Sequence, residues 1–188
     1  EDINRAPPKT QSALIEAMQE KQVSVGGETK ELPSPFFVLA TRNPIEEEGT
    51  FPLPTAQMDR FMIKTEMGYP DRDGERDIID RRLARRVSMP TVDQAVAPET
   101  FIRLQEMPDF VHFDEEIREY AIDLVRGTRT HEAVDIGVSP RGLQRFVEAI
   151  RARAVIHGRE FVIPDDVKLL AKRVLSHRLV LDSAALIE

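Results

Sequence analysis

Two adjacent carboxylates and one amide are the first residues of this 188-residue chain whose types could carry out chemistry. Glu1 and Asp2 suit a nucleoside triphosphatase, which uses one carboxylate to hold hydrated Mg2+ and another to orient the attacking water. Asn43 follows an apolar run, and a neutral amide there can donate to a γ-phosphate oxygen while accepting from that water. Taken separately, the two acids are better explained as a helix cap or as solvated side chains, and Asn43-Pro44 as a turn.

Two arginines extend this set of candidates. Arg60 lies between an acid and an aromatic residue, and an arginine that reaches a neighbouring subunit's site can stabilise transition-state charge. Arg141 follows Ser139-Pro140, which predicts a helix start, and both a guanidinium and a helix N-terminus favour an anion such as phosphate. Taken alone, Asp59-Arg60 is also explained as a surface pair. The order of all these groups along the chain is what indicates a nucleotide site.

The first region of the chain has the pattern of a parallel α/β sheet. Residues 36–40 form a continuous apolar run, which is typical of a strand buried on both faces. Gly26-Gly27 lies between two short alternating segments and predicts a hairpin. The expected elements are a helix over 8–21, a hairpin over 23–32, a strand over 36–40, a loop over 46–54, a helical turn over 56–60 and a strand over 61–63.

The second region is predicted to be helical throughout. Asp114 and Ser139 are predicted N-caps, and apolar residues recur on one face after each of them. The helices expected here cover 71–86, 98–107, 114–128 and 139–158, and a last one begins near 164. The fold class is therefore α/β followed by all-α, with one domain over 1–69, carrying a hairpin insertion at about 22–33, and a second over 70–188.

Composition narrows the classes of function. The chain has 33 acidic and 26 basic residues, a net charge of −7, which disfavours general affinity for nucleic acid or anionic membranes. It has no cysteine, so thiolate metal sites are excluded, and a reducing compartment is favoured. No apolar run approaches the roughly 20 residues that span a bilayer. We therefore expect a cytoplasmic protein.

Several stretches together resemble the MoxR group of AAA+ ATPases over nearly the whole chain. They are Asp2-Ile3-Asn4-Arg5-Ala6-Pro7-Pro8-Lys9-Thr10-Gln11, Ala40-Thr41-Arg42-Asn43-Pro44-Ile45-Glu46 with Gly49-Thr50, Leu53-Pro54 with Ala56-Gln57-Met58-Asp59-Arg60-Phe61, and Val138-Ser139-Pro140-Arg141. The resemblance implies the C-terminal part of such a protein, from the Walker B acids onward, with an incomplete parallel-sheet core and a helical lid.

The resemblance also implies roles for the candidate residues. Glu1 and Asp2 correspond to the Walker B acids that hold magnesium, Asn43 to sensor 1, Arg60 to the arginine finger and Arg141 to sensor 2. ATP and Mg2+ are the implied ligands, with Asn43 and Arg141 contacting the nucleotide. The implied assembly is a homo-oligomeric ring, a hexamer. The implied partners are client proteins, some with von Willebrand factor A domains, and the implied activities include chaperone-like complex assembly and metal-cofactor insertion.

Three features differ from the family pattern. The acids run Glu1 then Asp2, where the family has aspartate then glutamate, so the carboxylate expected to polarise water is one methylene shorter. Arg42 and Thr55 replace a common glutamine and a common glutamate. No G-x-x-x-x-G-K-[ST] phosphate-binding loop occurs in the chain. We therefore expect this piece alone to bind ATP weakly and to be inactive, and its strands to expose apolar surface.

Three hypotheses for the parent protein remain open. The first is an ATPase that couples hydrolysis in a ring to remodelling of a protein client. The second is a degenerate scaffold whose inverted acids bind nucleotide without turnover. The third is a DNA-directed motor, which the hairpin permits and the acidic balance opposes.

Overall fold

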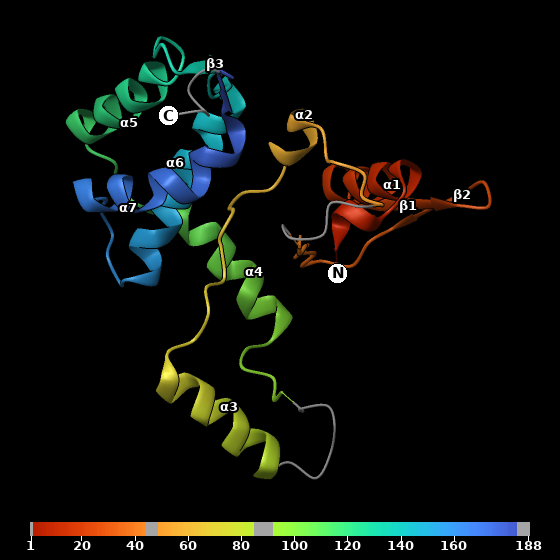
Figure 1. Cartoon of the computed structure of the whole chain (residues 1–188). Helices are drawn as coiled ribbons and strands as arrows, with labels where there is room; N and C mark the ends of the chain where they lie inside the picture. The colour runs from red at the N-terminus through yellow and green to blue at the C-terminus, as the bar shows by residue number, and fades with distance from the viewer. Residues whose placement is uncertain (1, 44–48, 85–91, 184–188) are drawn as a thin grey trace. The chain divides into compact units, whose positions relative to one another are not determined.

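The computed structural model describes residues 2–43, 49–84 and 92–183 (Figure 1). Glu1, residues 46–48 of the expected loop and residues 85–86 of an expected helix lie outside the described residues. The chain divides into a larger unit, Glu1–Lys64 with Pro98–Glu188, and a smaller unit, Thr65–Ala97. The expected boundary between residues 69 and 70 falls inside the smaller unit. The division into domains 1–69 and 70–188 therefore stays a prediction.

The start of the larger unit contains the predicted helix and hairpin. Its elements are η1 (Ile3–Arg5), α1 (Pro8–Glu20), β1 (Gln22–Val25), β2 (Glu28–Glu31) and α2 (Thr55–Met58). Strands β1 and β2 pair antiparallel, and the Gly26 and Gly27 between them have φ angles of 63° and 85°. A two-residue turn with both φ angles positive matches the twist of the flanking strands. The double glycine thus explains where the hairpin closes.

The strands expected over 36–40 and 61–63 are not present, which corrects those two predictions. Neither segment is assigned to a helix or a strand. The first segment ends beside the start of the chain, where the Ile3 amide donates to the Thr41 carbonyl at 2.9 Å. A strand needs a ladder of such bonds to a neighbour. Phe37 and Leu39 are 78% and 82% exposed, so the apolar run is uncovered in this chain, as the sequence predicted.

The second part of the larger unit is a helical bundle, as predicted. Its elements are α4 (Pro98–Glu106), η2 (Met107–Phe110), α5 (Glu115–Gly127), β3 (Val134–Ile136), α6 (Pro140–Ile156), α7 (Pro164–Leu175), η3 (Ser176–Arg178) and β4 (Val180–Leu181). The predicted caps are confirmed: Asp114 accepts from the Glu116 amide and Ser139 from the Gly142 amide, at 2.9 and 3.0 Å. The fully buried core side chains include Val125, Phe146, Ile150, Val167 and Val174. The short antiparallel pair β3–β4 was not predicted.

One buried carboxylate ties the end of α6 to α7. Asp166, 1% exposed, accepts hydrogen bonds from Arg159 at 2.7 and 2.8 Å and pairs with Arg153 at 3.1 Å. Burial alone would raise the pKa of Asp166. Hydrogen bonds from Arg159 and from the Ile163 amide, together with the charges of Arg159 and Arg153, outweigh burial and lower it. The carboxylate is therefore held in its charged form.

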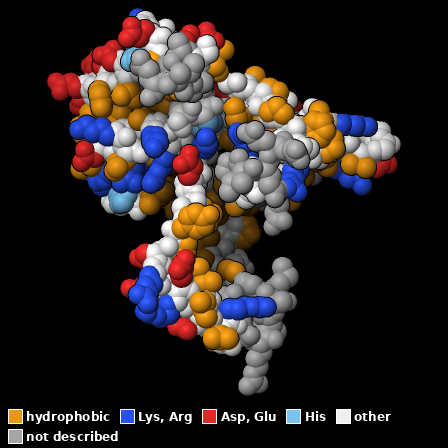
Figure 2. Space-filling model, viewed as in Figure 1, with side chains coloured by type: hydrophobic (Ala, Val, Ile, Leu, Met, Phe, Trp, Pro, Cys, Tyr) orange, Lys and Arg blue, Asp and Glu red, His pale blue; other side chains and the backbone are white. Residues whose placement is uncertain are grey.

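The smaller unit contains α3 (Arg72–Ala84), close to the predicted helix over 71–86. Its apolar side chains are exposed, by 59% at Ile78, 58% at Ile79 and 78% at Leu83. Figure 2 shows hydrophobic side chains lying among charged ones on this unit. No residue of α3 is buried. The helix is supported by local pairs such as Arg76 with Asp73 at 2.8 Å.

Candidate functional site

The acidic start of the chain lies beside the segment that carries Asn43. Glu1 lies outside the described residues. The Asp2 amide donates to the Thr41 hydroxyl at 2.9 Å, and the Asp2 carboxylate is 3.9 Å from the Arg5 guanidinium. Asn43 is half-buried, two residues after Thr41. The structure thus brings Asp2 to the stretch that ends at Asn43. The roles of the two residues in one site stay a prediction.

A buried glutamine that was not predicted from the sequence braces this arrangement. Gln11 on α1 is 3% exposed, and its side-chain amide donates to the carbonyls of Ile3 and Phe51 at 3.0 and 2.9 Å. The Phe51 amide also donates to the Asn4 carbonyl at 2.6 Å. These bonds join the first helix, the acidic start and the loop before α2. The one signal in the sequence that could have pointed to Gln11 is its position as a polar residue on the apolar face of α1.

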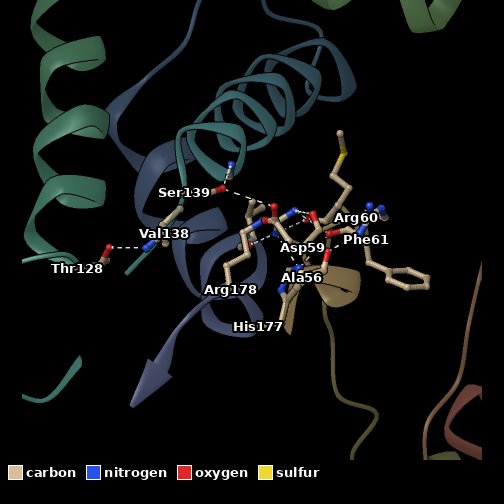
Figure 3. A network of polar contacts seen from close by, with 12 residues as sticks. Ala56, Asp59, Arg60, Phe61, Thr128, Val138, Ser139, His177 and Arg178 are labelled. Carbon is tan, nitrogen blue, oxygen red and sulfur yellow. Dashed lines mark hydrogen bonds and ion pairs between the residues drawn. The ribbon is translucent and has the colours of Figure 1, made fainter. Parts of the chain in front are cut away.

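A polar network joins α2 to the end of the helical bundle (Figure 3). Arg178, 3% exposed, donates from Nε to the Asp59 carboxylate at 2.8 Å. Its Nη2 donates to the carbonyls of Asp59 and Phe61 at 3.0 and 2.7 Å, and its Nη1 to those of Met62 at 3.3 Å and Val174. One guanidinium therefore fixes the backbone on both sides of Arg60.

His177 and Ser139 complete the network. His177 Nε2 lies 2.9 Å from the Phe61 carbonyl and 2.7 Å from Arg178 Nη1. A ring nitrogen that donates to the Phe61 carbonyl cannot also accept from Arg178, which can only donate, so Nε2 makes one of these two hydrogen bonds at a time. The Ser139 hydroxyl, while capping α6, lies 3.5 Å from the second oxygen of the Asp59 carboxylate. The first turn of α6 thus contacts the same carboxylate as Arg178.

Burial and neighbouring charge shift two pKa values in this network. Burial lowers the pKa of His177; the bond to the Phe61 carbonyl opposes this, and the cations Arg178 and Lys64 lower the pKa further. Burial also lowers the pKa of Arg178, which the Asp59 carboxylate opposes. The charges of Arg145 and Arg141 add to that lowering. Arg141 is therefore near enough to act electrostatically on the network.

The two predicted arginines lie at the edges of this network. Arg60 donates from Nη1 to the Ala56 carbonyl at 2.6 Å, one turn earlier along the chain, and its buried Nε has no hydrogen-bond partner among the described residues. Arg141 is exposed in the first turn of α6. Asp59, which the sequence alone also explained as a surface partner of Arg60, pairs with Arg178 instead. The sequence held no local signal for that pair, because its members are 119 residues apart.

Neither a metal cluster nor a membrane span is found in the described part of the chain. It contains no group of three or more histidine, cysteine, aspartate or glutamate side chains that could hold a metal ion. Asp2 is the one predicted magnesium ligand among the described residues, and its carboxylate lies 3.9 Å from the Arg5 guanidinium. Of the helices described here, none combines the length and the apolar character that crossing a membrane requires.

Comparisons with known proteins identify both parts of the larger unit. Residues 1–63 match the "ATPase family associated with various cellular activities (AAA)", and residues 126–188 match an AAA lid domain. YeaC of Bacillus subtilis (strain 168), an uncharacterised protein, is 46% identical over 188 residues, which are 100% of this chain and 58% of YeaC. Chaperone MoxR1 of Mycobacterium tuberculosis is 45% identical over 197 residues, covering 99% of this chain and 51% of that protein.

A solved structure shares the arrangement of the chain. The crystal structure of a candidate ATPase from Cytophaga hutchinsonii superposes with a TM-score of 0.90 at 36% identity, covering 99% of this chain and 59% of that one. These similarities confirm the predicted fold class, an incomplete α/β core followed by a helical lid. The chain spans about half the length of the curated relatives it matches, 58% of one and 51% of the other.

Proposed function

Because the chain belongs to the MoxR-type AAA+ ATPases, we propose that its parent protein couples ATP binding and hydrolysis to the remodelling of a protein client. The observation that carries the proposal is the order of the two family regions, together with the ion pair between Asp59 and the buried Arg178 that joins them. Asp59 lies in the region that matches the ATPase core, and Arg178 in the region that matches the lid.

Each predicted site residue has a separate role in the proposed hydrolysis of ATP. Asn43 would orient the attacking water and contact the γ-phosphate, since an amide can both donate and accept without adding charge. Arg141 would hold phosphate at the N-terminus of α6, where guanidinium and helix dipole both favour an anion. Glu1 and Asp2 would polarise the water and ligate Mg2+. A bound magnesium ion would neutralise phosphate charge.

Arg60 is proposed to act on the nucleotide of a neighbouring subunit. Its guanidinium is planar and permanently charged, which suits charge that develops on transferring phosphoryl oxygens. A group that acts on the next subunit needs a heterologous, head-to-tail interface, and such interfaces form a ring when the rotation between subunits closes. We therefore retain the proposed homo-oligomeric ring, a hexamer, as the functional form.

The client and the location are proposed from resemblance. One relative is named a chaperone, which supports chaperone-like assembly as the outcome of hydrolysis. Client proteins with von Willebrand factor A domains and cofactor insertion stay proposals of the same kind. A cytoplasmic location agrees with the absence of cysteine from the chain. Direct action on nucleic acid is disfavoured by the net charge of −7.

The proposal predicts that Arg60→Ala removes most ATP turnover. The measurement is phosphate release by a polypeptide of the relatives' length that includes this chain and a phosphate-binding loop. Removing one transition-state cation should lower kcat by a factor on the order of 10³, as for other arginines that act in trans. ATP binding, measured separately by fluorescent-nucleotide titration, should change little. The 188-residue chain alone should release no phosphate above background.

The same assay distinguishes the other two hypotheses. A degenerate scaffold, which the inverted acids Glu1 and Asp2 favour, would bind nucleotide but show no wild-type turnover for Arg60→Ala to remove. A DNA-directed motor would show turnover that DNA stimulates and that salt reduces. Equal turnover in wild type and Arg60→Ala would contradict the role of Arg60.

A further inference from the structure

We propose that Arg178 and Asp59 are positioning residues that hold Arg60 in a fixed relation to Arg141, so that both cations move with the lid. The inference rests on the proposed function, because it concerns how Arg60 is presented to a phosphate. It adds to that function a physical connection between the lid and the residue that would act in trans.

The bonds of Arg178 surround Arg60 in the sequence. Its Nη2 donates to the carbonyls of Asp59 and Phe61, the residues immediately before and after Arg60. Its Nη1 donates to the Met62 carbonyl, and its Nε to the Asp59 carboxylate at 2.8 Å. The backbone position of Arg60 is therefore set by one side chain that comes from the far end of the chain.

Arg178 is itself fixed to the lid. It ends η3, which follows α7 directly, and Nη1 also donates to the Val174 carbonyl of α7. Two further bonds join the same elements: His177 Nε2 lies 2.9 Å from the Phe61 carbonyl, and the Lys64 amide donates to the Arg173 carbonyl at 2.9 Å. A displacement of α7 must therefore carry residues 59–64 with it or break several buried hydrogen bonds, which is costly.

The same pair contacts the turn that carries Arg141. Ser139 caps α6 and reaches the Asp59 carboxylate at 3.5 Å. At Gly142, the residue after Arg141, a Cβ atom would lie 3.0 Å from Arg178 Cδ. Arg178 thus contacts both the segment that carries Asp59 and Arg60 and the first turn of α6, and Figure 3 shows Asp59 and Arg178 beside Ser139.

A lysine cannot take the place of Arg178 in this arrangement. The guanidinium places its donors in a rigid fork, and here Nε, Nη1 and Nη2 donate to three different acceptors, the Asp59 carboxylate and the Met62 and Phe61 carbonyls. A lysine ammonium keeps the charge but donates from a single nitrogen. Arg178→Lys therefore removes most of these hydrogen bonds while keeping the positive charge.

The test measures kcat for ATP hydrolysis in the longer polypeptide for wild type, Arg178→Lys, Arg60→Ala and the double variant. We expect Arg178→Lys to lower kcat about tenfold, because a displacement of about 1 Å of a catalytic group costs that much or more. In the Arg60→Ala background the same change should alter kcat less than about twofold, since the group that it positions is gone. Asp59→Asn, which preserves side-chain volume, should show the same dependence on Arg60 with a smaller loss.

Arg159→Lys is the matched control. It makes the same chemical change at another lid arginine paired with a buried carboxylate, Asp166. The other acceptor of Arg159 is the Phe161 carbonyl, which lies outside the segment 59–64. Arg159→Lys should change kcat by the same factor with and without Arg60→Ala. Circular dichroism and thermal unfolding verify that each variant is folded.

The outcomes separate this inference from the proposed function. If Arg60→Ala leaves turnover unchanged, or wild type has none, the proposed function fails and the positioning role with it. If Arg60→Ala abolishes most turnover but Arg178→Lys has no effect, or has the same effect in both backgrounds, the inference alone is overturned. If Arg178→Lys and Asp59→Asn both fail to fold, the pair is a folding contact and the positioning role is rejected.

Discussion

At the scale of the residue, the most informative group is His177, a buried imidazole next to a buried guanidinium. Its Nε2 lies 2.7 Å from Arg178 Nη1, and its Nδ1 has no hydrogen-bond partner among the described residues. A second proton on this ring would place two cations in contact. Burial and that neighbour explain why the pKa of His177 is lowered, with Lys64 adding to the effect and Asp59 opposing it.

This lowered pKa predicts a loss of stability below neutral pH. In the unfolded chain a histidine titrates near pH 6.5. As the pH falls below that value, the unfolded state binds a proton at His177 before the folded state does, which lowers the free energy of unfolding. The stabilising preference for the neutral ring is fully present above about pH 6.5 and is lost as the pH falls towards the depressed folded pKa. Urea unfolding of the 188-residue chain between pH 7.5 and about 5.5 should show it.

His177→Gln is the control for this prediction. Glutamine keeps a polar side chain near the Phe61 carbonyl but does not titrate. The slope of unfolding free energy against pH in this window should therefore be smaller in the variant than in wild type. Equal slopes would show that His177 takes up no proton on unfolding and would contradict the assignment of its charge state.

At the scale of the element, the start of α6 is packed against Arg178 through a glycine. A Cβ atom at Gly142 would lie 2.6 Å from Val138 Cγ1 and 3.0 Å from Arg178 Cδ, and valine is stiff about its first side-chain torsion. Gly127, the last residue of α5, has nothing within 4 Å of the equivalent position. A methyl group would therefore clash at Gly142 and would meet no atom at Gly127.

Alanine substitution should have opposite effects at these two glycines. Gly127→Ala should stabilise the chain by about 0.5 kcal/mol, because alanine loses less backbone entropy in a helix. Gly142→Ala should destabilise it by about 1–3 kcal/mol, the usual cost of overpacking. Urea unfolding of both variants measures the difference. Stabilisation by Gly142→Ala would contradict the close packing of Val138 and Arg178 against Gly142.

The helices were predictable because their signals are local. Asp114 and Ser139 are caps that act within three residues, and Gly26-Gly27 closes a hairpin between neighbours in sequence. The strand over 36–40 was wrong because its apolar pattern requires pairing partners, and the described residues supply a single bond from Ile3 to Thr41. Strands β3 and β4 were missed since three and two residues carry too little pattern.

Of the candidate site, the sequence supplied residue types but not their contacts. Asp2 and Asn43 were candidates by residue type and by their order along the chain, and the contact of Asp2 with Thr41 appears only in the structure. The sequence could not predict that Asp59 pairs with Arg178, because Arg178 is far away in sequence and donates mainly to backbone carbonyls. Every residue has a backbone carbonyl, so residue types do not indicate which carbonyls accept these hydrogen bonds.

At the scale of the whole molecule, the proposed function places each active site between two copies of the protein. The acids and Asn43 would act on the nucleotide of their own subunit, while Arg60 would act on that of the next. The chain itself spans 51% to 58% of the curated relatives described above, so the claim concerns the longer protein. It predicts that two inactive variants can complement each other.

The most direct test mixes Arg60→Ala with Asp2→Asn subunits of the longer ATPase and measures phosphate release against each variant alone. In a ring assembled from equal amounts, about one interface in four would pair an intact acid with an intact arginine, because heterologous interfaces join one subunit to the next. We predict that turnover in the mixture rises well above the mean of the two variants. No recovery in rings shown to be mixed would place Arg60 and Asp2 in the same subunit's site and contradict the account.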